Sequence, residues 1–97
     1  MPAYLYANVE VTDPAAYETY RARVPALIAA HGGRYLVRGG ACEVLEGSAE
    51  PHRHVILEFP DMAQLKAFYA SSAYQELIAV RQGASRGTLL AIEGVAL

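Results

Sequence analysis

The stretch GGRYLVRGG at residues 32–40 is the most informative about the fold, because it contains a short strand-like segment between two pairs of glycines. Glycine tolerates the left-handed conformation that commonly ends a helix, so Gly32 is predicted to stop a preceding helix. The second pair, Gly39 and Gly40, is typical of a β-bulge or a close approach of two backbones. A phosphate-binding loop is disfavoured, since its N–H groups must open a helix rather than follow one.

Upstream of this stretch, the sequence predicts a strand and then a helix. Residues 4–11 (YLYANVEV) alternate strictly between two faces, as a half-buried strand does. Residues 14–31 carry apolar side chains at helical spacing, with Asp13 as the N-cap and Pro14 at the first helical position. Pro25 lies inside this helix and cannot donate to the carbonyl four residues earlier, which predicts a kink.

Downstream, the pattern indicates a hairpin, two helices and a last strand. Pro60 ends the third strand and Asp61 caps the following helix. The predicted segments are a continuation of the second strand over 41–47 (ACEVLEG), a turn over 47–51, a strand over 52–59, helices over 61–71 and 71–82, and a strand over 86–95.

The order β-α-β-β-α-β predicts an α+β, ferredoxin-like fold, an antiparallel sheet with the helices on one face, and residues 1–97 form a single domain. The helices are predicted to cover Leu5, Val9, Val55, Leu57, Phe59, Leu90 and Ile92. The other face would present Tyr4, Tyr6, Asn8, Leu36, His54, Ile56, Glu58 and Ala91. This second face is too apolar to remain bare, so the sequence predicts a homodimer in which two sheets pack together and enclose a partly polar cavity.

Composition excludes several classes of protein. The net charge is −2 and no stripe of Lys or Arg is present, so nucleic-acid binding is not expected. Cys42 is the one cysteine, and no signal peptide or long apolar run is seen, which predicts a cytoplasmic protein without membrane association. The sequence has no nucleotide-binding fingerprint and no zinc-like spacing, so neither a cofactor nor a metal is expected.

Three runs together resemble one known family: VPALIAAHGGRYLVRGGACEVLEG (24–47), PHRHVILEFPDM (51–62) and AFYASSAYQELIAVRQGASRG (67–87). The chain resembles, over essentially its whole length, domain-of-unknown-function family 1330. The resemblance implies a dimeric α+β barrel, related in fold to antibiotic-biosynthesis monooxygenase-like and muconolactone isomerase-like proteins. It implies no particular reaction.

The arginine pair in the opening stretch supplies one candidate ligand contact. Simple alternation places Arg34, Leu36 and Arg38 on one face, which would bring Arg38 near Asn8, His54 or Glu58. Such a guanidinium can clamp a carboxylate or phosphate with two parallel hydrogen bonds. The alternative is an ion pair with Glu58 that satisfies a partly buried charge.

Two further groups of side chains are candidates for chemistry. His54 can act as a general base, helped by Glu58; a metal shared with His52 lacks a third ligand. Tyr69, Tyr74 and Arg81 are expected to roof a cavity at the strand ends, where Tyr74 would donate to a ligand and Arg81 would bind an anion. Alternatively, Tyr74 anchors its helix in the core and Arg81 pairs with a carboxylate.

These residues support two classes of function. In the first, the dimer binds a small anionic or aromatic metabolite, with Asn8, Arg38, Glu58, Tyr69 and Arg81 as ligand contacts. In the second, it is a cofactor-independent enzyme, an isomerase or monooxygenase-like protein, in which His54 and Tyr74 are the acid and base and Arg38 is the anchor.

Overall fold

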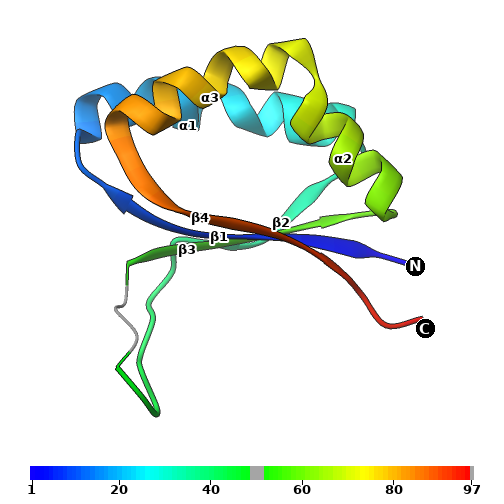
Figure 1. The fold of residues 1–97 in the computed structure, drawn as a ribbon, viewed down its shortest axis with the longest axis horizontal. Helices are drawn as coiled ribbons and strands as arrows, with labels where there is room; N and C mark the ends of the chain where they lie inside the picture. Colours follow the sequence, from blue (N-terminus) through cyan, green and yellow to red (C-terminus); the bar gives the residue numbers. More distant parts are fainter. Residues whose placement is uncertain (49–51, 97) are drawn as a thin grey trace.

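The elements follow the predicted order, including the two helices predicted over 61–71 and 71–82, in the computed structural model, which describes residues 1–48 and 52–96. They are β1 (Ala3–Val11), α1 (Pro14–Ala30), β2 (Arg34–Arg38), β3 (Arg53–Phe59), α2 (Met62–Ala70), α3 (Ser72–Ala84) and β4 (Ser85–Glu93). The four strands form an antiparallel sheet in the order β2-β3-β1-β4, and all three helices lie over one face of it (Figure 1). The predicted ferredoxin-like α+β fold is therefore confirmed.

Strand β1 lies between β3 and β4, and its alternation decides which face is covered. Leu5, Ala7 and Val9 are buried under the helices, whereas Tyr6 and Asn8 between them are only partly buried. The strict alternation of residues 4–11 thus has its expected cause, a sheet with one helix-covered face.

Helix α1 begins as its sequence predicts. The Asp13 carboxylate accepts a hydrogen bond from the Ala16 N–H at 3.2 Å, and Pro14 occupies the first helical position. Pro25 lies within the helix, where it has no N–H to donate to the carbonyl of Arg21.

The same helix ends in the motif predicted from the first glycine pair. Gly32 has a φ of +75°. Its N–H donates to the carbonyl oxygen of Ala29 at 3.0 Å, and the N–H of Gly33 donates to the carbonyl oxygen of Ile28 at 2.9 Å. These two bonds satisfy carbonyls of the last turn. A side chain at Gly33 would collide with Phe59, so this glycine also lets α1 approach β3.

The later helices also start at short polar side chains. Asp61 accepts from the Gln64 N–H at 2.8 Å at the start of α2, and Ser71 accepts from the Tyr74 N–H at 3.3 Å at the start of α3. Two caps so close in sequence divide this region into two helices. None of the helices that the structure describes combines the length and apolar character needed to cross a bilayer.

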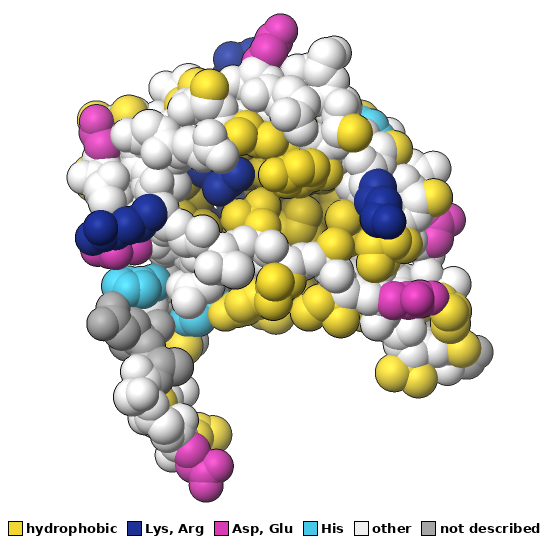
Figure 2. Space-filling view, in the orientation of Figure 1, with side chains coloured by type: hydrophobic (Ala, Val, Ile, Leu, Met, Phe, Trp, Pro, Cys, Tyr) yellow, Lys and Arg dark blue, Asp and Glu magenta, His cyan; other side chains and the backbone are white. Residues whose placement is uncertain are grey.

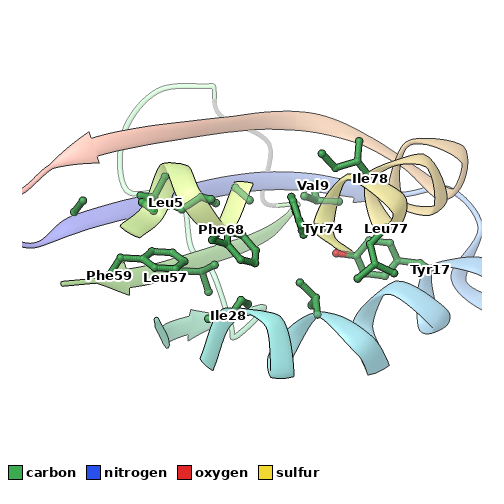
Figure 3. Close-up of a cluster of buried hydrophobic side chains, with 14 of the residues drawn as sticks. Leu5, Val9, Tyr17, Ile28, Leu57, Phe59, Phe68, Tyr74, Leu77 and Ile78 are labelled. Carbon is green, nitrogen blue, oxygen red and sulfur yellow. The ribbon is translucent and has the colours of Figure 1, made fainter. Parts of the chain in front are cut away.

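The aromatic core joins these helices to the sheet. Phe59, Phe68, Tyr74 and Leu77 are fully buried (Figure 3). The rings of Phe68 and Tyr74 lie 4.4 Å apart between centroids, and those of Phe59 and Phe68 lie 5.4 Å apart. Burial of Tyr74 fixes α3 against the sheet and so positions the polar residues of that helix.

The side chains of strand β4 point to the opposite faces of the sheet from those predicted. Leu90 and Ile92 were expected under the helices, but they are 48% and 49% exposed on the other face, while Leu89 packs against the core. The cause lies at the start of the strand: α3 ends at Ala84 and β4 follows at once with the buried Ser85. Every second residue from Ser85 then faces the helices.

The second strand is shorter than predicted. β2 ends at Arg38, Gly39 has a φ of +67°, and no strand is formed over residues 40–48. This segment projects from the sheet on the side away from the helices, with Leu45 90% exposed (Figure 1). Residues 49–51 of the predicted turn lie outside the described residues.

A bulge in β2 changes the facing of its last residue. Tyr35 pairs with Leu57, but the next paired residue, Val37, lies opposite Ile56, so Leu36 is an extra residue in the strand. Arg38 then lies opposite Val55 on the helix-covered face, and not on the open face where simple alternation placed it.

Candidate functional site

A small cavity lies between the helices and the sheet and gathers basic and phenolic side chains. It is lined by Arg21, Arg38, Arg53 and Arg81, by Tyr17, Tyr20, Tyr35 and Tyr74, and by apolar core residues. Its volume is about 40 Å³. Because a water molecule in the liquid takes about 30 Å³, this space suits one small polar group rather than a whole metabolite.

The positive charge at this cavity lacks an acidic partner inside it. Arg81, from α3, is only 8% exposed, and its Nε atom has no hydrogen-bond partner among the described residues. The same holds for Nε of Arg53, from β3. No Asp or Glu is among the residues that line the cavity in the described part of the chain, although Arg21 reaches Glu18 outside it at 3.5 Å. Buried guanidinium groups without a counter-charge favour an anion.

Two tyrosine hydroxyls from different helices meet at the cavity. The hydroxyl oxygens of Tyr20 in α1 and Tyr74 in α3 lie 2.8 Å apart. Burial raises the pKa of both groups above the ordinary 10.0, and the positive charge of Arg81 opposes part of that rise in pKa for each. Both tyrosines therefore remain protonated at neutral pH; one hydroxyl donates to the other, and the accepting hydroxyl keeps its own proton to donate to an anion.

Arg38 lies at the edge of the cavity. Its guanidinium carbon is 4.5 Å from the centre of the Tyr35 ring, and its Nη2 donates to the carbonyl oxygen of Arg21 at 3.4 Å. Stacking on the ring holds the guanidinium over the cavity while leaving N–H groups available. The burial of Tyr35 raises the pKa of its hydroxyl, and the charge of Arg38 opposes this shift in pKa.

A glycine of the opening stretch makes room for Arg53. A Cβ atom at Gly39 would collide with the Arg53 guanidinium, and the Gly39 N–H donates to the His54 carbonyl at 2.8 Å. The predicted close approach at Gly39 is thus present, although the bulge lies at Leu36. Sequence reasoning missed Arg53 as a site residue, yet a signal existed: it shares an apolar strand face with Val55.

The structure divides the predicted site residues between two faces of the sheet. Arg38, Tyr74 and Arg81 line the cavity together. Asn8, His54 and Glu58 lie on the open face, and Tyr69 lines a separate groove. His54 and Tyr74 therefore cannot act on the same atoms of a substrate bound at the cavity.

The open face carries its own polar cluster. Tyr6 and His54 are hydrogen-bonded through the hydroxyl and Nδ1 at 2.6 Å. Nε2 of His54 and Oδ1 of Asn8 are buried without a partner among the described residues. Arg34, rather than Arg38, pairs with Glu58, at 2.8 Å. Among residues 1–48 and 52–96, no three His, Cys, Asp or Glu side chains are placed to hold a metal ion.

An apolar row crosses the same face. Val37, Ile56, Tyr6 and Leu90 are successive partners across all four strands. In the described part of the chain all helices lie over the other face of the sheet, and the segment beyond Gly39 projects on this side (Figure 1). The face thus combines exposed apolar side chains with polar atoms that have no partner in the part of the chain that the structure describes.

A larger groove adjoins the cavity on the side of strand β4. It lies between α2 and β4, has a volume of about 400 Å³, and shares Leu5 and Leu89 with the cavity. In Figure 2 the surface is hollowed between the helices and the strands and is largely hydrophobic, with Lys or Arg side chains toward its ends.

The sheet order and the single helical layer define the chain as an α+β protein of the ferredoxin-like class. The family described as domain of unknown function (DUF1330) matches residues 2–95, and the chain belongs to this family. A comparison with curated proteins found no match.

Solved structures share the fold at low sequence identity. A protein of unknown function from Rhodopseudomonas palustris, RPA0582, is 21% identical with a TM-score of 0.80, over 99% of this chain and 84% of that one. SnoaB from Streptomyces nogalater, a cofactor-independent oxygenase, is 14% identical with a TM-score of 0.67, over 99% and 95%. A dimeric ferredoxin-like protein of unknown function from Jannaschia sp. is 19% identical with a TM-score of 0.67, over 99% and 100%. At these identities the likeness concerns the fold alone.

Proposed function

We propose that this protein binds a small anionic metabolite, and that the anionic group lies in the cavity lined by Arg38, Arg53 and Arg81. One observation carries the proposal: Arg81 is buried at the cavity, and the described residues supply neither a hydrogen-bond partner for its Nε nor an acidic side chain in the cavity lining. An unpaired buried charge costs several kcal/mol in a folded protein, about 3–5 when a pair is broken. An anion supplied by a ligand removes that cost.

The hydrogen-bonded pair of Tyr20 and Tyr74 completes the anion site. The hydroxyl that accepts within the pair donates its own proton to a carboxylate without adding charge, and the arginines supply the attraction. Arg38, at the edge, is the contact that a bound anion meets first. The site therefore uses two of the ligand contacts expected from sequence, Arg38 and Arg81, and adds Arg53.

Nuclear magnetic resonance can test this directly, because the arginine Nε–Hε pair gives its own signal. Titration with sodium acetate should shift the Arg81 and Arg53 Nε–Hε signals to saturation, whereas sodium chloride at equal ionic strength should not. Arg81→Met should weaken acetate binding at least tenfold. Arg23→Met, at an exposed position of α1 outside the cavity, should bind like the wild type. Signals that do not move with acetate would refute the proposal.

A second candidate function is acid catalysis without a cofactor, and the Tyr20–Tyr74 pair favours it. In that case Tyr74 gives its proton to a substrate carbonyl oxygen while a solvent water takes a proton from the adjacent carbon, which yields the enol; the tyrosinate regains its proton from that water, and the arginines stabilise the negative charge that develops on the oxygen. His54 takes no part, because it lies on the other face. Hydrogen exchange at C3 of 2-oxobutyrate in D2O should then be accelerated by the wild type and not by Tyr74→Phe.

We also propose that two copies pack through the open face of the sheet. The row Val37, Ile56, Tyr6 and Leu90 supplies apolar contact, and a partner can satisfy the Nε2 atom of His54. The ferredoxin-like protein from Jannaschia sp., which shares this fold and is itself described as dimeric, supports a dimer.

A further inference from the structure

The size of the arginine cavity limits what it can hold. At about 40 Å³ it accommodates a carboxylate-sized group, whereas pockets that bind whole metabolites occupy about 300–1,000 Å³. A ligand held there must extend into neighbouring space. The groove between α2 and β4, at about 400 Å³, is the neighbouring space, and it shares the lining residues Leu5 and Leu89 with the cavity.

The groove is apolar along its walls. Leu65 and Ala70 line it from α2, and Leu89 and Ala91 line it from β4. Among the described residues that line the groove, Lys66 is the one charged side chain. It is exposed, so its stem can cover apolar surface while its ammonium group stays in water. Charge is therefore concentrated at the cavity end, and the groove offers contact for a hydrocarbon body.

We propose that the ligand is an amphipathic monocarboxylate, whose carboxylate lies in the arginine cavity and whose alkyl or aryl body lies in the groove between α2 and β4. This inference rests on the proposed function, because the carboxylate is placed by the same arginines. The carboxylate of such a ligand would be attracted by the arginines of the small cavity, and its hydrocarbon body would pack against the apolar walls of the larger groove.

A series of straight-chain carboxylates tests the inference. Acetate, butyrate, hexanoate and octanoate are titrated into the wild-type protein by calorimetry. The dissociation constant should fall roughly three- to fourfold for each added methylene, because each buried methylene contributes about 0.8 kcal/mol. Nuclear Overhauser contacts should also join the terminal methyl of bound octanoate to the ring protons of Tyr69.

A matched pair of variants locates the apolar body. Ala91→Phe fills the groove from β4, whereas Ala63→Phe adds the same side chain to an exposed position of α2 outside the groove. Ala91→Phe should abolish the gain with chain length and leave acetate binding intact; Ala63→Phe should preserve both. The Tyr69 contacts in the wild type provide a second measurement that does not depend on how Ala91→Phe folds.

The outcomes separate the two proposals. If acetate binds and longer chains bind no better, the amphipathic ligand is refuted and the anion site stands. If the gain with length survives in a folded Ala91→Phe variant, the body lies elsewhere and the inference is overturned. If no carboxylate binds, both proposals fail.

Discussion

The Arg38 guanidinium donates to the carbonyl oxygen of Arg21, which is the carbonyl that Pro25 leaves without an intrahelical donor. In an uninterrupted helix the N–H at position 25 would occupy this oxygen. The proline predicted from sequence to disturb α1 thus also exposes an acceptor at the edge of the cavity. The proline in α1 thereby provides the acceptor that holds the Arg38 guanidinium of β2 in place.

The first prediction concerns this link. Pro25→Ala restores the N–H donor to Arg21, so Arg38 should lose part of its hold and become more mobile. The new backbone amide at position 25 should exchange slowly with D2O, and the Arg38 side-chain signals should sharpen toward those of a free arginine. Acetate affinity should fall about three- to fivefold, which lies within the 0.5–1.5 kcal/mol, roughly, that one hydrogen bond contributes. Unchanged Arg38 signals would contradict the link.

Replacement of the buried arginine should separate stability from binding. Arg81→Met keeps much of the side-chain volume and removes an unpaired charge, so thermal unfolding without ligand should occur at the same temperature or higher. Acetate should stabilise the wild type and not the variant. The outcome against the proposal is a variant that unfolds well below the wild type, since Arg81 would then be a structural residue with a partner of its own.

Alkaline pH should weaken the fold through the tyrosine pair. Tyr20 and Tyr74 have a pKa above 10.0 in the folded protein, so they keep their protons when the unfolded chain has lost them. The free energy of unfolding should therefore be insensitive to these groups below about pH 10 and fall above it, by up to about 1.4 kcal/mol per pH unit for each tyrosine.

The double variant Tyr20→Phe/Tyr74→Phe provides the comparison for this pH effect. It removes both hydroxyls together, which avoids leaving one buried hydroxyl without a partner. Urea unfolding followed from pH 8 to pH 11.5 should show a shallower alkaline decline for the variant. If the free energy of unfolding falls with pH equally in the wild type and the variant, neither tyrosine has a different pKa in the folded and unfolded states.

The open face predicts the association state. Sedimentation at micromolar concentration should give twice the 10.5 kDa of one chain for the wild type, and Leu90→Asp should shift the protein to the monomer. Ala79→Asp, on an exposed position of α3, serves as the control and should remain dimeric. A monomeric wild type would refute pairing through this face.

Sequence reasoning predicted the fold well, because the signals that define it are local. Alternation in β1, the Asp13 cap and the Gly32 stop each depend on a few neighbouring residues, and each is present in the structure. The family resemblance carried the same fold independently.

The candidate site was predicted only in part, because one extra residue in a strand reverses the face of the sheet to which every later side chain points. The single extra residue Leu36 turned Arg38 to the other face, and the immediate start of β4 at Ser85 exchanged Leu89 for Leu90 in the core. Arg53 could have been found from its place on an apolar strand face. The meeting of Tyr20 with Tyr74 could not, since it depends on how α1 and α3 pack.

The bulge at Leu36 also affects how relatives are to be compared. A homologue with one residue fewer in β2 would show an arginine in the same alignment column and present it to the opposite surface. Conversely, two relatives could keep a cation at the cavity while their arginines fall in different columns. In this fold, the insertion or deletion of a single residue moves a charged side chain from one face of the sheet to the other without replacing any amino acid. Relatives should therefore be compared by the register of their strands as well as by residue identity.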